Sequence, residues 1–330
     1  MTRSLLVAPQ WIGDSVMTEP LLRRLHARGE WLTVAALPWV APVYRAMPQV
    51  AEVMELPYAH GSLHLPARRK LAVQLRGRFD VAYVCPNSLK SALIPWWAGI
   101  ARRVGYAGES RYLLLNQRLP NPAPGQRPPM VAFYSALSLE SGTEWDRPQL
   151  QLSPAVQSAA LQAVSALLAA AGKSGLPLTP QGYDVFAPGA EYGQAKRWPA
   201  AHFAELAARL NLPVLLLGSA KEQGLCADIA AAAHIRRPGA CINLAGRTGL
   251  EQALALIAAA KTVVSNDSGL MHVAAAFGLP QVAIFGSSSP LHTPPLNPKA
   301  QVLWLKNNPD YQPPLDCAPC YARECPLVHT

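Results

Sequence analysis

The sequence predicts an α/β protein built from two doubly wound, Rossmann-like domains that face each other across a cleft. Short β-rich runs alternate with helical stretches in both halves of the chain, and this alternation is typical of βαβ units with a parallel sheet. The 330 residues, half of them apolar, are also enough to bury two cores of ordinary size. We therefore expect an N-terminal domain at residues 1–150 and a C-terminal domain at residues 151–330.

The first half of the chain alternates strands and helices up to a Pro-rich passage at residues 119–129. The expected strands are residues 4–8, 32–37, 53–56 and 81–85, and the expected helices are residues 15–27, 67–78 and 88–98. An Ala-rich helix at residues 154–171 follows. The Gly, Pro, Ser and Thr residues between positions 172 and 182 are typical of a hinge.

The second half repeats the same alternation. The expected strands are residues 184–187, 214–217, 242–244, 262–265 and 281–285, and the expected helices are residues 199–210, 221–233, 250–260 and 269–277. In doubly wound sheets the ligand binds beyond the carboxyl ends of the strands. Functional residues are therefore expected in the loops that follow strands.

Composition and charge narrow the class of protein. The apolar stretches are far shorter than the ~20 residues of a membrane-spanning helix, and Pro9 and Asp14 interrupt the apolar N-terminus before a signal peptide develops. We expect a cytosolic protein. The net charge of +9 favours an anionic partner, but Lys and Arg are scattered and no nucleic-acid-binding motif is present. An anionic substrate is the better interpretation.

The loop after the first strand, residues 9–15, carries Gly13 and Asp14 and leads into a helix. Gly13 permits a tight turn, and Asp14 or Ser15 can cap the helix. Alternatively, the Asp14 carboxylate acts as a general base at the mouth of the cleft. The loop contains no G-x-G-x-x-G pattern, so a dinucleotide fingerprint is absent.

The loop at residues 187–199 carries Gly189 and Ala190, then Lys196 and Arg197, and ends at a predicted helix start. Small residues and cations beside a helix N-terminus favour an anion-binding site over a merely solvated basic loop. A third strand–helix junction places Asp267, Ser268, Gly269 and His272 together. The helix dipole there suits a diphosphate, whereas the alternative is an ordinary N-cap with a buried histidine. A hydroxyl-rich loop at residues 285–295 could line the same pocket.

Several motifs in register resemble the ADP-heptose:lipopolysaccharide heptosyltransferases, with the type II subfamily matching best. They are residues 11–14 (WIGD), 86–92 (PNSLKSA), 188–191 (PGAE), 195–199 (AKRWP), 266–276 (NDSGLMHVAAA) and 285–290 (FGSSSP). The resemblance covers nearly the whole chain. It implies the GT-B architecture and an inverting transfer of L-glycero-D-manno-heptose from ADP-heptose to the heptosyl-Kdo inner core of lipopolysaccharide.

The resemblance also implies roles for individual residues. Asp14 is the expected general base and Lys196 the cation that neutralises the leaving phosphate. The expected donor-binding residues are Gly189, Ala190, Lys196, Thr248, Asp267, Ser268, Gly269 and His272. The expected acceptor-binding residues, in the N-terminal domain, are Gly13, Asn87, Lys90, Arg68 and Arg69. The basic cluster at Arg68, Arg69 and Lys70 is equally well explained as a solvated helix face.

No cofactor is expected beyond the ADP-heptose substrate. The chain has no DxD-type pair in a suitable loop, so Lys196 and the helix that starts near Ser268 would replace a divalent metal. The expected partners are ADP-heptose and the lipopolysaccharide acceptor, without nucleic acid. The expected location is cytoplasmic, peripheral to the inner face of the inner membrane. Family members continue into a further helix, whereas this chain stops at Thr330, so we expect looser domain closure.

Two rival functions remain open. A GT-B-like epimerase or hydrolase would break down the nucleotide sugar without an acceptor, and a polyanion-binding protein would show salt-sensitive nucleic-acid binding without ADP affinity. Use of a type I acceptor is a further alternative within the family.

Six cysteines fall into two groups. Cys85, Cys226 and Cys241 lie in apolar or helical surroundings and are expected to be core thiols. The second group has the spacing of a structural zinc site remote from the cleft, with a disulfide or free thiols as the alternatives. Its four candidate ligands are Cys317, Cys320, Cys325 and His329.

Overall fold

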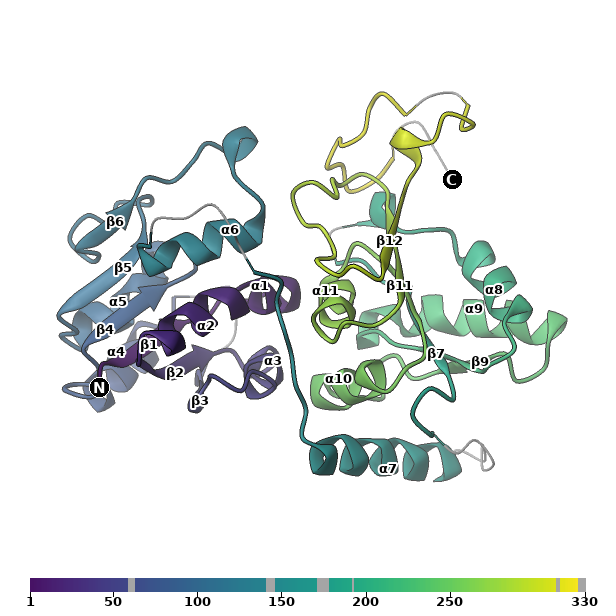
Figure 1. Ribbon diagram of the computed structural model, residues 1–330, viewed down its shortest axis with the longest axis horizontal. Coiled ribbons are helices and arrows are strands. Elements are labelled where there is room, and N and C mark those ends of the chain that lie inside the picture. Colours follow the sequence, from purple (N-terminus) through teal and green to yellow (C-terminus); the bar gives the residue numbers. More distant parts are fainter. Residues whose placement is uncertain (59–62, 141–145, 171–177, 192, 313–314, 326–330) are drawn as a thin grey trace. The chain divides into compact units, whose positions relative to one another are not determined.

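The chain forms two compact α/β units, Met1–Gln151 and Leu152–Thr330 (Figure 1). A computed structural model describes residues 1–58, 63–140, 146–170, 178–191, 193–312 and 315–325. In this part of the chain no helix is both long and apolar enough to cross a bilayer.

Six parallel strands form the sheet in the described part of the first unit, in the order β3-β2-β1-β4-β5-β6. Their bounds are β1 (Arg3–Val7), β2 (Trp31–Ala36), β3 (Glu52–Glu55), β4 (Val81–Val84), β5 (Arg102–Tyr106) and β6 (Gln117–Leu119). The central strands are near-continuous apolar runs because helices cover both faces of a parallel sheet. In the register, Leu5 pairs with Thr33 of β2 and with Ala82 of β4.

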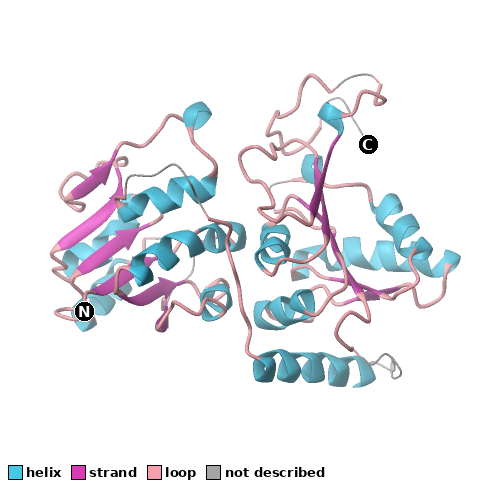
Figure 2. Cartoon of the chain, in the orientation of Figure 1, coloured by secondary structure: helices cyan, strands magenta, loops and turns pink. Residues whose placement is uncertain are grey.

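Helices connect these strands (Figure 2). They are α1 (Ile12–Met17), α2 (Glu19–Ala27), α3 (Ala41–Arg45), α4 (Leu65–Gln74), α5 (Leu89–Trp97) and α6 (Met130–Ser135). The single helix predicted at residues 15–27 is wrong, because the chain forms α1 and α2 with Thr18 between them. Pro20 lacks an amide hydrogen and therefore suits a helix start, and α2 begins one residue before it.

The second unit repeats this winding, with the order β12-β11-β10-β7-β8-β9 for its described strands. The strands are β7 (Asp184–Ala187), β8 (Val214–Leu216), β9 (Cys241–Asn243), β10 (Val263–Asn266), β11 (Gln281–Phe285) and β12 (Ala300–Trp304). The helices are α7 (Pro154–Ala170), α8 (Ala200–Arg209), α9 (Gln223–Arg236), α10 (Leu250–Ala258) and α11 (Gly269–Ala276). Numbered within its own unit, each sheet has the order 3-2-1-4-5-6, so the predicted pair of doubly wound α/β units is confirmed.

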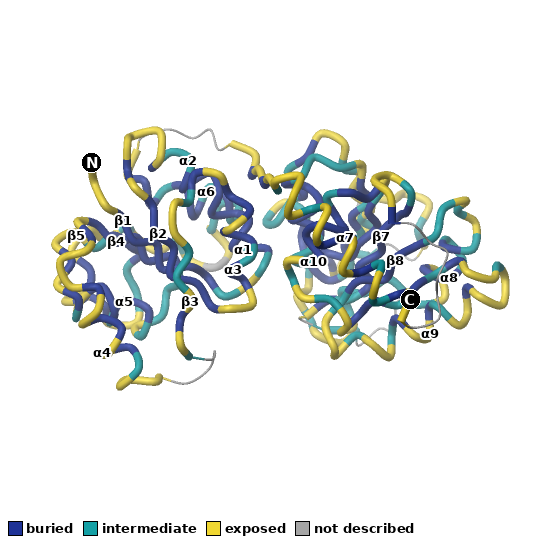
Figure 3. Tube along the Cα trace, turned by 90° about the horizontal axis from the view of Figure 1, so that it is seen from below, coloured by how far each residue is buried: buried dark blue, intermediate teal, exposed yellow. Residues whose placement is uncertain are grey.

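The core of each unit lies between its sheet and its helices, and the buried segments in Figure 3 include the central strands of each sheet. In the second unit Phe186 of β7 packs against Phe203 of α8, with ring centroids 5.7 Å apart. Val214, Leu216 and Ile229 belong to the same buried cluster. A second cluster contains Met271 of α11 and Phe285 of β11.

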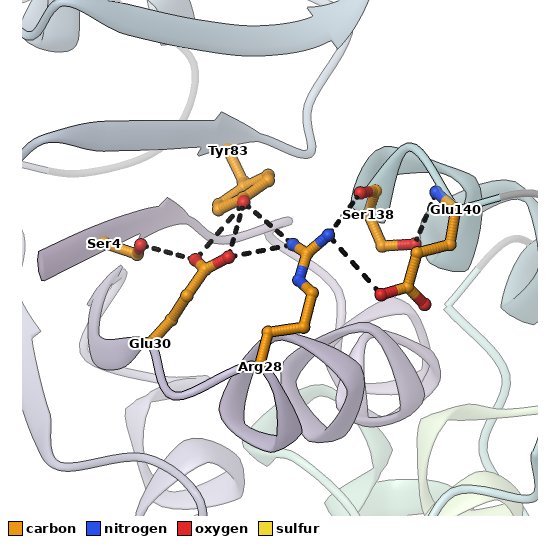
Figure 4. A network of polar contacts seen from close by, with 6 residues as sticks. All are labelled: Ser4, Arg28, Glu30, Tyr83, Ser138 and Glu140. Carbon is orange, nitrogen blue, oxygen red and sulfur yellow. Dashed lines mark hydrogen bonds and ion pairs between the residues drawn. The ribbon is translucent and has the colours of Figure 1, made fainter. Parts of the chain in front are cut away.

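A partly buried polar network lies in the first unit, and its members are shown in Figure 4. Glu30 precedes β2 and accepts hydrogen bonds from Ser4 Oγ at 2.5 Å and Tyr83 Oη at 3.1 Å. Arg28 donates to Glu30 at 2.8 Å and to the Ser138 carbonyl at 2.8 Å, and it also pairs with Glu140 at 3.4 Å. Glu30 lies at the amino edge of the sheet, so this network joins strands rather than forming a ligand site.

The hinge predicted at residues 172–182 is not the unit boundary, which falls after Gln151. Residues 171–177 lie outside the described residues. The remainder of the segment belongs to the second unit, where the preceding helix α7 packs against α10. Of the described residues of this segment, Pro180 and Gly182 therefore mark a connection inside the unit, since these residues favour turns wherever the chain must reverse.

Candidate functional site

The winding of each sheet predicts where ligands bind. In the order 3-2-1-4-5-6 the connections leave strands 1 and 4 in opposite directions, which opens a crevice beyond the carboxyl ends of these two strands. In the first unit these strands are β1 and β4, and in the second unit they are β7 and β10. The candidate site residues are therefore expected in the loops after Val7, Val84, Ala187 and Asn266.

A cavity of about 390 Å³ lies at this point in the first unit. The loops after β1 and β4 form most of its wall, and α4 and α6 each contribute a side chain. The polar part of the lining includes Asp14, Arg68, Asn87, Ser88, Lys90 and Tyr134. Among the described lining residues, the cavity therefore combines one carboxylate, of Asp14, with two cations, of Arg68 and Lys90.

Asp14 lies in the first turn of α1, and its Oδ1 accepts a hydrogen bond from Tyr134 Oη at 2.9 Å. Burial raises the pKa of the Asp14 carboxyl from 3.8 to about 6, and the bond from Tyr134 partly opposes this rise. The capping interpretation is wrong, because the N-cap residue is Trp11 and no side chain caps α1. A carboxylate with a pKa just below neutral is instead suited to accept a proton.

Arg68 has its guanidinium held on three sides. It donates to Leu63 O at 2.8 Å, to Tyr58 Oη at 2.9 Å and to Lys90 O at 3.1 Å, and it also stacks over the Tyr58 ring. The interpretation of the basic cluster as a solvated face is therefore wrong for Arg68. The interpretation as a solvated face agrees with Arg69 and Lys70, because both side chains are exposed. Arg69 is not part of the cavity lining.

Among the other predicted acceptor residues, Asn87 and Lys90 line the cavity and Gly13 is buried inside α1. A residue that sequence analysis missed supports this wall. The buried Arg111 donates to Pro86 O at 2.8 Å, to Asn87 Oδ1 at 3.4 Å and to Tyr106 O. Arg111 lies 24 residues from Asn87, and no local pattern in the sequence links the two.

In the second unit the corresponding loops bring Lys196 and Asp267 together. Lys196 Nζ lies 2.6 Å from Asp267 Oδ2, which also accepts a hydrogen bond from Ser288 Oγ at 2.7 Å. Both side chains of the ion pair are largely buried. Loops that follow three different strands, β7, β10 and β11, thus meet at one point.

His272 is buried on α11, and the charges of both Lys196 and Asp267 affect its pKa. Burial lowers the pKa of His272 from 6.5 to about 4, with Asp267 raising it and Lys196 lowering it to smaller extents. The imidazole is therefore neutral at physiological pH. Gly269 begins α11 and Ser268 is its N-cap, so the amide groups that start this helix lie directly after Asp267.

Asn266, at the end of β10, fixes the loop that carries Lys196. Its Oδ1 accepts the Trp198 amide hydrogen at 2.9 Å, and its Nδ2 donates to Pro188 O at 2.7 Å. The side chain therefore bridges both ends of the loop after β7. In the sequence Asn266 stands out only as the first residue of the motif at 266–276. Its place directly before Asp267 is the one feature that indicates a role beside the site.

Gly189, Ala190 and Thr248 also follow strands of the second sheet. A Cβ on Gly189 would lie 2.2 Å from Glu222 Oε1, so a larger residue here would displace this carboxylate. Glu222 in turn accepts hydrogen bonds from the Ser219 amide and hydroxyl groups. Ala190 is buried, and Thr248 lies in the loop between β9 and α10.

The Cys-rich segment contacts the loops around Lys196. The Ala195 amide donates to Arg323 O at 3.0 Å, the Tyr321 amide donates to Ser287 O at 2.8 Å, and Ser287 Oγ donates to Ala322 O at 3.1 Å. The Ser287 amide also donates to Ala195 O at 3.1 Å. The expectation that this segment is remote from the donor residues is therefore wrong, because it packs directly on the loop that carries Lys196.

No group of three or more His, Cys, Asp or Glu side chains in the described ranges is arranged to hold a metal ion. Cys317, Cys320 and Cys325 are free thiols, and His329 lies outside the described residues. The four-ligand zinc hypothesis thus stays a prediction. Cys85 and Cys226 are buried, as predicted for core thiols, whereas Cys241 is half-buried.

The chain is similar to known proteins in family profile, sequence and structure. A family profile described as "Glycosyltransferase family 9 (heptosyltransferase)" matches residues 68–327. Lipopolysaccharide heptosyltransferase 2 of Escherichia coli K12 is 45% identical to this chain, over 91% of the chain and 87% of that protein. Lipooligosaccharide heptosyltransferase 2 of Haemophilus influenzae is 40% identical, over 91% of the chain and 88% of that protein.

Solved structures agree with the sequence matches. The structure of E. coli ADP-heptose lps heptosyltransferase II superposes with a TM-score of 0.80 at 41% identity, covering 97% of this chain and 96% of that one. The E. coli heptosyltransferase WaaC, solved with ADP, superposes with a TM-score of 0.66 at 22% identity, covering 91% and 92%. The second likeness is one of fold.

Proposed function

The chain belongs to glycosyltransferase family 9, the heptosyltransferases, and from this membership we propose that it moves a heptose from ADP-heptose to the inner core of lipopolysaccharide. The acceptor is heptosyl-Kdo, as in the type II subfamily, and the anomeric carbon is inverted. The observation that carries the proposal is the match of 45% identity to a heptosyltransferase 2 over 91% of the chain. The clusters around Asp14 and Lys196 supply groups for both halves of the reaction.

The second unit binds the donor in this proposal. The diphosphate of ADP-heptose lies against Lys196 and the first amide groups of α11, after Ser268 and Gly269, because a cation and a helix N-terminus both stabilise negative charge. Gly189, Ala190 and Thr248 complete the donor site from neighbouring loops. Asp267 holds Lys196 in place at 2.6 Å, and the neutral His272 contacts the donor without adding charge.

The first unit binds the acceptor and activates it. As the acceptor oxygen forms a bond to the anomeric carbon, the bond from that carbon to the ADP oxygen breaks and its electron pair goes to the diphosphate. The acceptor proton passes to the Asp14 carboxylate. A positioned base of this kind contributes about 10²–10⁴-fold to the rate. Arg68 and Lys90 bind the acidic groups of the acceptor, and Asn87 and Gly13 complete the site.

Lys196 takes the place of a divalent cation in this mechanism, since it neutralises the charge that develops on the leaving diphosphate. The proposal therefore requires neither a metal nor another cofactor. The enzyme works at the cytoplasmic face of the inner membrane, where the lipid-linked acceptor is exposed. Transfer in the presence of EDTA, unchanged by added magnesium, is the expected result.

The test is transfer to defined acceptors. The protein is incubated with ADP-heptose and either a Kdo-terminated or a heptosyl-Kdo-terminated inner core, and the linkage formed is identified by mass spectrometry and NMR. Transfer only to the heptosyl-Kdo-terminated core supports the acceptor of the type II subfamily. Transfer only to the Kdo-terminated core would instead establish the acceptor of the type I subfamily. Release of ADP without any transfer product would favour a hydrolase and overturn the proposal.

A further inference from the structure

The connection between β5 and β6 presents an apolar tip to solvent. Tyr112 is 66% exposed and Leu113 is 84% exposed, although the two residues that follow them are buried. Leu114 and Leu115 belong to a cluster with Val84 and Ala92, which fixes the connection against β4 and α5. The tip is therefore held outward by a packed base and does not fold back onto the core.

Arg118 reinforces this shape. Its Nη1 donates to Tyr112 O at 2.8 Å and to Leu115 O at 2.9 Å, which bridges the exposed and the buried part of the connection. Its guanidinium carbon lies 6.0 Å from the centroid of the Tyr112 ring. A tyrosine, a leucine and an arginine thus form one surface, which we call the Tyr112 tip. Such combinations suit a membrane interface, where aromatic rings and long cationic side chains bridge apolar and polar layers.

The tip is joined to the wall of the cavity that contains Asp14. Arg111, directly before Tyr112, donates to Pro86 O and Asn87 Oδ1, and both of these residues line the cavity. Glu109 Oε2 accepts the Leu89 amide hydrogen at 2.7 Å, so the start of the same connection contacts the start of α5. The exposed tip and the acceptor cavity are therefore joined by hydrogen bonds through Arg111 and Glu109.

The surrounding sequence has an unbalanced charge. Residues 81–139 contain six Lys or Arg residues, and Glu109 is their one acidic residue. Its carboxylate is engaged by the Leu89 amide. This segment includes both the tip and the β4 loop of the cavity. An anionic surface is the complementary partner, since each cation near an anionic bilayer strengthens binding by about five-fold.

We propose that the Tyr112 tip docks on the surface of an anionic lipid bilayer. Tyr112 and Leu113 enter the interfacial layer, while Arg118 and the other cations of segment 81–139, apart from the buried Arg111 and the cavity residue Lys90, contact the headgroups. One leucine and one tyrosine bind membranes weakly by themselves, so charge supplies the second component. The docking places the acceptor cavity beside the membrane, and this consequence rests on the proposed function because it assumes a lipid-linked acceptor.

Sedimentation with vesicles tests the docking directly. The full chain is mixed with vesicles of phosphatidylethanolamine and phosphatidylglycerol, or of phosphatidylcholine alone. We expect binding to the anionic vesicles only, falling as salt is raised because screening weakens the headgroup contacts. Tyr112→Ser together with Leu113→Ser should weaken binding by about ten-fold, since the apolar contribution is lost.

Ile235→Ser is the matched control. Ile235 is 85% exposed and stands beside Arg236 in the second unit, so it offers similar apolar exposure next to a cation. Its loss should leave vesicle binding unchanged. Equal binding by the double variant and the unaltered chain, or equal loss with Ile235→Ser, would overturn the proposal. Thermal unfolding of each variant verifies that the fold is retained.

Activity separates this inference from the proposed function. With a water-soluble acceptor that lacks acyl chains, the double variant should retain kcat/KM, whereas with acceptor embedded in anionic vesicles its rate should fall about ten-fold. An equal fall with both acceptors would overturn the docking role. Absence of transfer by the unaltered chain would contradict the proposed function alone, because vesicle sedimentation does not depend on turnover.

Discussion

At the scale of single residues, Asp14 shows how burial prepares a carboxylate for proton transfer. Removal from water disfavours its charge and raises its pKa to about 6, whereas the hydrogen bond from Tyr134 favours the charge. The balance leaves Asp14 ionised at neutral pH but more basic than a solvated carboxylate. Because the folded pKa exceeds the unfolded value, the native state loses stability as pH rises from about 4 through about 6.

We predict that Asp14→Asn lowers turnover by about 10²–10⁴-fold, because an amide cannot accept the acceptor proton. The affinity for ADP, measured by calorimetry, should not change, since ADP is assigned to the other unit. The variant should also be more stable than the unaltered chain at neutral pH, by on the order of 2 kcal/mol, because no charge is buried. Near-normal turnover would remove Asp14 from the mechanism.

Tyr134→Phe tests the hydrogen bond by its effect on pH dependence. Without the phenol donor the pKa of Asp14 should rise above about 6. On acidification, the variant should therefore lose activity at a higher pH than the unaltered chain. The acidic limb of the profile of kcat/KM against pH should therefore move towards neutral. A lower rate with an unmoved limb would show that Tyr134 acts on the acceptor and does not tune Asp14.

Lys196→Ala should weaken ADP-heptose binding and lower kcat, because the leaving diphosphate loses its cation and Asp267 remains as an unpaired buried charge. Lys299→Ala removes an exposed lysine from the same unit and serves as the control for net charge. Isothermal titration and steady-state kinetics distinguish the two variants. If both substitutions had equal, small effects on ADP-heptose affinity and kcat, Lys196 would act only through the net positive charge of the unit.

The sequence was sufficient to predict the chemical groups of the candidate site but not the residues that support them. Asp14, Lys196 and Asp267 each follow a strand, and strand ends are where doubly wound sheets bind ligands. Tyr134 lies 120 residues from its partner Asp14. Arg111 and Asn266 likewise act through distant backbone atoms. Such pairs arise from packing of the whole unit, which leaves no spacing pattern to detect.

At the scale of elements, β1 to β4 and β7 to β11 were predicted to within about one residue at each end, the edge strands β3 and β9 included. β7 and β11 have the predicted bounds, because continuous apolar runs identify strands that are covered on both faces. The strands β5, β6 and β12 were missed. β5 begins with two arginines, while β6 and β12 are edge strands with several exposed residues, so none has the apolar pattern of a central strand.

The contact between the Cys-rich segment and the Lys196 loop requires a glycine. Gly193 has φ of 151°, and a Cβ there would lie 2.3 Å from Arg323 O. We predict that Gly193→Ala displaces the segment and lowers affinity for ADP-heptose by about ten-fold, because the neighbouring Lys196 shifts. Binding by calorimetry is the measurement.

Gly239→Ala is the matched control for this experiment. Gly239 also has a positive φ, of 76°, but a Cβ there meets no atom within 4 Å. It should cost about 1 kcal/mol of stability through backbone strain and leave donor affinity intact. If both alanines weakened binding alike, strain would be the cause, and contact with Arg323 would not matter.

At the scale of the whole molecule, the two units have separate sheets and separate cores. A ligand that binds one unit should stabilise mainly that unit. We predict that ADP slows amide hydrogen exchange at residues 193–199 and 267–276 and leaves residues 7–14 unchanged. Exchange followed by mass spectrometry measures both sets in one experiment. Equal protection of residues 7–14 would show that ADP contacts the first unit as well.

The contact of residues 321–323 with Ala195 and Ser287 also has a consequence for synthesis of the chain. The ribosome releases the amino-terminal residues first, and domains fold as they emerge. Both loops of the second unit therefore leave the ribosome before the segment that joins them. The Ala195 amide and the Ser287 side chain obtain their partners only after residues 321–323 have emerged. A nascent chain can thus complete the wall around Asp14 while the loop of Lys196 still lacks these bonds.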